Sequence, residues 1–295
     1  MPLGIIREVA KLDWDLLRKQ ISNVVCSARM AVVIALSCVL MAIQYWTSHH
    51  AGFIVSGGTQ TFLSDTMLFS RFGTGSELYL FLLPLIAALL GGEVVSVERH
   101  SRRMYAIVPR VGRRRYLNTS LCAGFLLGGL GGVSPLTLNM LLAAVMNPRL
   151  DFIDGMETDA SGWVHEDKYV LISSTSWVYP LYRMNQVVCI LFIIAVVFVI
   201  SGLFALVAMG CSFFTKRRHI ELLVPFLLNL LWWMLPALTN LSVPDQWSCI
   251  IFLFFSPPES PDLAGKNVEG LVLTVVLLSA MAAVLQYAER RRDVL

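Results

Sequence analysis

Six long apolar segments constrain the fold of this chain more than any other feature. They occupy residues 30–46, 78–97, 117–146, 187–214, 220–238 and 270–288. A helix needs about 20 apolar residues to cross the hydrocarbon of a bilayer, and each segment comes close to that length or exceeds it. Only 15% of the residues are charged, whereas a soluble domain carries about 25%. We therefore predict an all-α, polytopic membrane protein with six transmembrane helices.

The distribution of basic residues predicts the orientation of these helices. If the N-terminus lies inside, 18 of the 23 lysines and arginines fall in inner segments: 1–29, 98–116, the link between the fourth and fifth spans, and the tail 289–295. Lysine and arginine near membrane spans collect on the cytoplasmic side. We therefore expect both termini inside, outer loops at 47–77, 147–186 and 239–269, and a plasma membrane, of bacterial type, as the location.

The cytoplasmic N-terminal segment, residues 1–29, carries a helical pattern of its own. Trp14, Leu17, Ile21 and Val24 recur every three to four residues, which predicts an amphipathic helix. Its place just before the first span favours a helix lying in the membrane interface, with tryptophan at headgroup depth. The alternative is a cytoplasmic helix packed on protein.

The segment between the second and third spans is strongly basic. Seven arginines occur in it: Arg99, Arg102, Arg103, Arg110, Arg113, Arg114 and Arg115. Arginine is costly in hydrocarbon, so the segment must lie in water or at the headgroup surface. The charge could serve as a stop-transfer signal that contacts anionic lipid, or as a surface that a cytoplasmic partner grips.

The span interiors carry almost no ionisable residue. Glu93, near the end of the second span, is the exception, and His219 and Glu221 lie at the mouth of the fifth. Proton or sodium coupling usually relies on intramembrane charged residues, so a self-powered transporter is disfavoured. The chain has no Walker A motif, zinc-protease motif or nucleophile–base arrangement. We expect no enzyme activity, metal or cofactor in this chain alone.

Some small and polar residues in the spans could serve either of two roles. Three polar side chains within the spans could line a cargo path or form hydrogen bonds between helices: Gln44, Asn139 and Asn229. The third span repeats G-x-x-x-G at Gly124, Gly128 and Gly132. This pattern lets helix backbones approach closely, either within one protomer or at a dimer seam.

Two outer segments stand out. The loop 147–186 is acidic, which suits a solvated loop or, alternatively, a vestibule for cationic cargo or a metal site. Residues 247–255 are apolar but too short to cross the bilayer, and two prolines follow them. We predict a re-entrant or interfacial piece there.

The basic segment has an ordered pattern. Glu98-Arg99 opens it, an apolar stretch covers 104–108, Pro109 follows, and Arg113 comes four residues later. This pattern resembles the permease subunits of ATP-binding-cassette (ABC) exporters of the type-2 family. The family has Gly-Thr after Glu-Arg, where this chain has His100-Ser101. The resemblance covers the whole chain in topology and about twenty residues in motif.

The resemblance implies a specific assembly. Two permease subunits, identical or not, form the pathway, and two separate ATPase subunits that bind ATP and Mg dock on the cytoplasmic face. The coupling helix would lie in the loop 98–116. It would contact the ATPase through Glu98, Arg99, Arg102, Arg103, Tyr105 and Pro109.

The cargo expected for such an exporter is a drug, peptide, lipid or other amphipathic molecule. Membrane lipids are partners, and nucleic acid is not. The alternative function is a membrane immunity or sensor protein that binds a peptide or toxin without transport.

Overall fold

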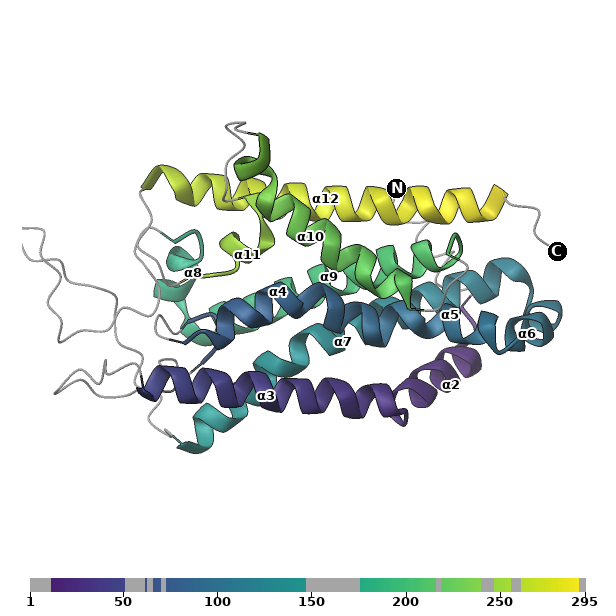
Figure 1. Cartoon of the computed structure of the whole chain (residues 1–295), viewed down its shortest axis with the longest axis horizontal. Coiled ribbons are helices and arrows are strands. Elements are labelled where there is room, and N and C mark those ends of the chain that lie inside the picture. Colours follow the sequence, from purple (N-terminus) through teal and green to yellow (C-terminus); the bar gives the residue numbers. More distant parts are fainter. Residues whose placement is uncertain are drawn as a thin grey trace, which may run out of the picture.

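The computed structural model of the protein describes residues 12–50, 62, 66–69, 73–146, 176–215, 219–239, 247–255 and 261–291. Within these ranges every regular element is a helix (Figure 1). Five helical segments are long and apolar enough to cross a membrane: Ala28–Ser48, Gly75–His100, Arg113–Met146, Gln186–Ser212 and Lys266–Ala288. This confirms the prediction of a multi-pass, all-helical membrane protein.

The predicted span 220–238 corresponds to a helix whose apolar part is shorter than that of the other five. Helix α10 runs from Ile220 to Thr239, but the apolar helix counted within it, Ile220–Met234, is shorter than the other five. Six crossings and their orientation therefore stay a prediction.

Helix α2 (Trp14–Val25) precedes the first span, α3 (Ala28–His50). Asp13 begins α2 because its side chain accepts a hydrogen bond from the backbone N–H of Leu16 at 3.1 Å. The backbone N–H of Asp13 donates to the Thr119 hydroxyl at 3.1 Å. Trp14 is exposed, while Leu17 is buried. The amphipathic helix is thus packed on protein by one face, and its exposed Trp14 remains available to an interface.

The second span is one continuous helical segment with three parts. Helix α4 (Gly75–Ala87) is followed by η2 (Ala88–Gly92), a π-helix, and then by α5 (Glu93–His100). Every residue of η2 except Leu89 is buried. A π-helical turn inside an α-helix often marks a functional position, and the apolar run of the sequence contained no signal for it.

Helix α6 (Arg103–Val111) lies between the second and third spans, and α7 (Arg113–Met146) forms the third. Two residues with positive φ flank α6: Arg102, with φ 60°, precedes it, and Gly112, with φ 88°, follows it. Glycine adopts such angles without strain, whereas arginine rarely does. The chain therefore makes two sharp breaks around α6.

The remaining helices are α8 (Tyr179–Met184), α9 (Gln186–Ser212), α11 (Cys249–Phe252) and α12 (Pro261–Arg291). Helix α12 begins nine residues before the predicted span 270–288, within the segment expected as an outer loop. Proline at a first helical position suits a helix start, because its missing N–H would be unpaired there. The re-entrant piece predicted at 247–255 contains α11, whose Cys249 and Phe252 are buried.

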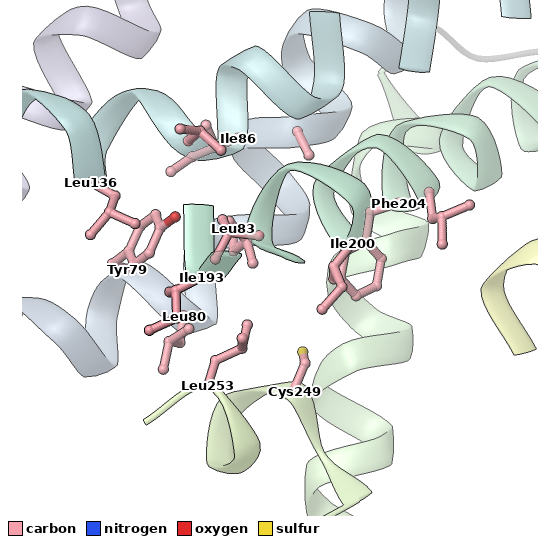
Figure 2. Packing of buried hydrophobic residues seen from close by; sticks show 14 of the residues in the cluster. Tyr79, Leu80, Leu83, Ile86, Leu136, Ile193, Ile200, Phe204, Cys249 and Leu253 are labelled. Atoms are coloured by element: carbon pink, nitrogen blue, oxygen red, sulfur yellow. The ribbon is translucent and has the colours of Figure 1, made fainter. Parts of the chain in front are cut away.

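The core lies where α4, η2, α7 and α9 meet, and α11 closes it from one side (Figure 2). Tyr79 of α4 is fully buried and donates from its hydroxyl to the carbonyl of Gly132 on α7 at 2.7 Å. Leu83 and Ile200 of Figure 2 pack in the same cluster. The glycines of α7 face this core.

Close backbone contact explains those glycines. A Cβ atom added to Gly128 would lie 2.2 Å from the Ala205 Cβ, and one added to Gly91 would lie 2.2 Å from the Gly124 carbonyl oxygen. At Gly132 it would meet the Ser201 hydroxyl at 2.0 Å. The faces that the G-x-x-x-G pattern exposes are thus filled by η2 and α9 of the same chain, which favours packing within one protomer over a dimer seam.

Candidate functional site

The candidate site lies at one end of the helix bundle, where α2, α5, α6, the start of α7 and the end of α9 come together (Figure 1). We call this the basic end. The opposite end carries the start of α4, residues 66–69, α8 and α11. Helix α12 also ends toward the basic end (Figure 1). Basic sequence segments that are distant along the chain therefore converge on one side of the bundle.

Helix α6 is amphipathic and lies on the surface of this end. No residue of α6 is fully buried. Met104, Ile107, Val108 and Val111 are partly buried against a small cluster that includes Val95, Tyr116 and Phe213. The other face of α6 carries exposed side chains: Arg103, Tyr105, Ala106, Pro109 and Arg110. With a 61% exposed side chain, Tyr105 is the one large aromatic of this face.

Glu98, expected to contact a partner protein, forms hydrogen bonds within the chain. The Tyr116 hydroxyl donates to its Oε2 at 2.5 Å, and the Gln20 amide lies 3.3 Å from both carboxylate oxygens. The same amide nitrogen donates to the Ser120 hydroxyl at 2.9 Å. Glu98 thus joins α5 to α2 and α7. Hydrogen bonds to a charged acceptor are stronger than those between neutral groups, so the Glu98 carboxylate stabilises the contact of α5 with α2 and α7.

Arg99 is also committed to an internal contact. Its Nη1 donates to the Ser212 carbonyl, at the end of α9, at 2.8 Å. That carbonyl belongs to the last turn of a helix, where backbone acceptors lack intrahelical partners and cations are favoured. Arg99 therefore joins α5 to α9, as Glu98 joins it to α2 and α7.

The six residues expected to couple to a partner thus separate into two groups. Glu98 and Arg99 hold helices together within the chain. Arg102, Arg103, Tyr105 and Pro109 lie exposed on or beside α6, and in the described part of the chain no side chain of these four has a hydrogen-bond or ion-pair partner. Contact with a partner stays a prediction for all six.

A buried ionic cluster lies beside these residues. Arg29, at the start of α3, pairs with Glu93 of α5 at 2.9 Å between Nε and Oε2. His219, just before α10, places Nδ1 2.7 Å from the other oxygen of Glu93. The Glu93 side chain is only 3% exposed. This carboxylate therefore ties the starts of α3 and α10 to the second span.

A second buried carboxylate continues the cluster. Glu221 of α10 accepts a short hydrogen bond from the Ser96 hydroxyl of α5 and a 3.4 Å contact from the Thr215 hydroxyl after α9. It is 1% exposed. The sequence analysis identified Glu93, His219 and Glu221 as ionisable residues near span ends. It did not predict that Arg29 would pair with Glu93 or that Ser96 would donate to Glu221. Such pairing depends on packing between helices that are far apart in the sequence.

The three expected cargo-path residues all bond to their own chain at the opposite end. Gln44 Oε1 accepts from the Ser76 backbone N–H at 3.1 Å, and Asn139 Oδ1 accepts from the Met67 backbone N–H at 2.6 Å. Asn229 Oδ1 accepts from the Cys249 thiol at 2.7 Å. These contacts favour the structural use of the three side chains, and their part in a cargo path stays a prediction.

No group of three histidine, cysteine or carboxylate side chains among the described residues is placed to hold a metal ion. The acidic stretch of loop 147–186 falls on residues 147–175, which lie outside the described ranges. Comparison of the chain with family models, curated proteins and solved structures finds no match.

Proposed function

We propose that this chain is the permease subunit of an ATP-driven ABC exporter, coupled through α6 to a separate ATPase subunit. The observation that carries the proposal is the construction of the basic end. An exposed short helix lies on the surface, and residues of α5, just before it, are bonded to five other elements. Glu98 joins α2 and α7, Arg99 joins α9, and Glu93 joins α3 and the start of α10.

Such a construction suits the transfer of mechanical work. A force on α6 acts on α5 across the sharp break at Arg102. The side-chain contacts of α5 would carry it to the ends of the other spans. Alternating access needs an element with two arrangements whose balance a ligand shifts. In this proposal ATP binding to the partner supplies that shift.

We further propose six spans with both termini on the cytoplasmic side. Helix α10 would be the fifth crossing, extended beyond Met234 by the remaining turns to Thr239. The convergence of basic segments at the end that carries α6 supports this orientation. A bacterial plasma membrane, two ATPase subunits and a second permease subunit complete the proposed assembly, with ATP and Mg bound by the ATPase.

Affinity purification of the full chain from its native membrane, in a mild detergent, tests the proposal. We expect an ATPase subunit with Walker motifs to be retained in near-equal amount. The double variant R103Q/Y105A, on the exposed face of α6, should lose that subunit. The matched control is V284A/Y287A on α12, which removes exposed side chains away from α6. Purification without any nucleotide-binding subunit would instead favour the immunity or sensor function.

A further inference from the structure

A polar depression lies where α5, α6 and the end of α9 meet. Its volume is about 280 Å³, and five residues line it: Arg99, His100, Arg102, Tyr105 and Thr215. Four of the five can present hydrogen-bond donors, as guanidinium, imidazole or hydroxyl groups, while the Thr215 hydroxyl donates to Glu221. No carboxylate lines the depression. A lining of this kind suits an anion.

Three of the lining side chains are held in place by bonds to the chain. Arg99 uses one nitrogen for the Ser212 carbonyl at 2.8 Å, which fixes its guanidinium while leaving other N–H groups. His100 Nδ1 lies 2.8 Å from the Ser96 carbonyl, so Nδ1 carries hydrogen and donates. The hydroxyl of Thr215 lies 3.4 Å from Glu221. Pre-positioned donors lower the ordering cost of binding.

The two nearby carboxylates are bonded to other groups and do not line the depression. Glu98 is engaged by Gln20 and Tyr116, and Glu221 is buried against Ser96. Within the described residues Arg102 has no ion-pair partner. The positive charge of Arg102 is therefore available to a ligand.

We infer that this depression binds a phosphate group, and that the phosphate is the headgroup of an anionic phospholipid. Arginine forks match the geometry of phosphate oxygens. The depression lies where two membrane-length segments end, at His100 and Ser212, which is the level of the headgroup layer. Exposed Tyr105, an aromatic with a polar tip, is typical of that layer. The binding is a property of the chain alone and does not require an ATPase.

Native mass spectrometry of the purified full chain in an uncharged detergent tests the inference. The protein is titrated separately with phosphatidylglycerol, phosphatidylcholine and inorganic phosphate. We expect one phosphatidylglycerol to be retained in preference to phosphatidylcholine. The variant R102N, whose asparagine tolerates the left-handed backbone, should lower retention about fivefold, the contribution of one basic residue near a lipid surface. H100Q should lower it as well.

The matched control is R110Q, which removes the same charge from α6 outside the depression. It should change retention less than twofold. Equal losses in R102N and R110Q would mean diffuse charge attraction and would overturn the site. Equal retention of the two lipids would also overturn it. Competition by inorganic phosphate without a preference for phosphatidylglycerol would overturn the lipid source and leave a soluble phosphate ligand.

Discussion

The buried ion pair between Arg29 and Glu93 allows a quantitative prediction. The two side chains lie 2.9 Å apart, and at an effective dielectric constant of about 20 their attraction is ~6 kcal/mol before desolvation. Desolvation of two buried ions offsets most of this, so the pair contributes little net stability compared with apolar replacements. Removal of one partner is different, because it takes away the attraction and leaves the other ion desolvated.

The two single variants should differ because the partners are not equally buried. The Glu93 side chain is 3% exposed and that of Arg29 is 20% exposed. Arg29→Met leaves the buried Glu93 carboxylate with the His219 ring, itself 54% exposed, in place of its guanidinium partner, and should destabilise the protein by about 3 kcal/mol. Glu93→Gln leaves a guanidinium that can reach water, and it keeps an amide that can accept from Arg29. We expect a cost of about 1–2 kcal/mol.

Unfolding by titration with sodium dodecyl sulfate, followed by tryptophan fluorescence in mixed micelles, measures these free energies. The double variant R29M/E93Q should cost less than the sum of the two single costs, because it leaves no stranded charge. A larger cost for Glu93→Gln than for Arg29→Met would refute the burial argument. Strict additivity in the double variant would refute the pairing itself.

Three further predictions concern contacts around the same helices, and the same unfolding titration measures each. Tyr116→Phe should cost about 1.5–3 kcal/mol, because the charged Glu98 carboxylate loses the hydrogen bond that the Tyr116 hydroxyl donates to it. Gly112→Ala should cost about 1–3 kcal/mol from backbone strain at φ 88° alone, since nothing lies within 4 Å of an added Cβ, and an unchanged stability would contradict that angle. Gly128→Ala should cost more than Gly112→Ala, and adding Ala205→Gly should restore part of the loss; no restoration would mean that the 2.2 Å contact is not the cause.

The apolar segments of the sequence were enough to predict five helices of membrane length, while the sixth stays a prediction. The expected segment 117–146 lies within α7 (Arg113–Met146), and 187–214 nearly coincides with α9 (Gln186–Ser212). Hydrophobic length carries this information because a bilayer demands it locally. Helix α12 starts earlier than predicted. The prediction missed its first turns because they carry polar residues, which hydropathy assigns to a loop.

The partners within the candidate site could not be predicted in the same way. Gln20 and Glu98 are 78 residues apart, and His219 and Glu93 are 126 apart. No local pattern records which side chains meet across packed helices. The π-helical turn of η2 was equally hidden, since its Leu and Gly residues also suit an ordinary apolar helix. The exposed face of α6 was not predicted either, because the segment 104–108 was taken as an apolar stretch, whereas Tyr105 and Ala106 within it are exposed.

The bundle is held together in different ways along its length, and this bears on how it would move. Its middle is joined by glycine contacts between η2, α7 and α9, where a single added methyl group would collide with a neighbour. Close-packed contacts of this kind transmit displacement instead of absorbing it. The basic end is joined by ion pairs and hydrogen bonds of long side chains, whose partners can exchange with water when the helices separate. Under the proposed function, the polar contacts of the basic end would pass a force on α6 to the spans, and the close-packed middle would act as the pivot.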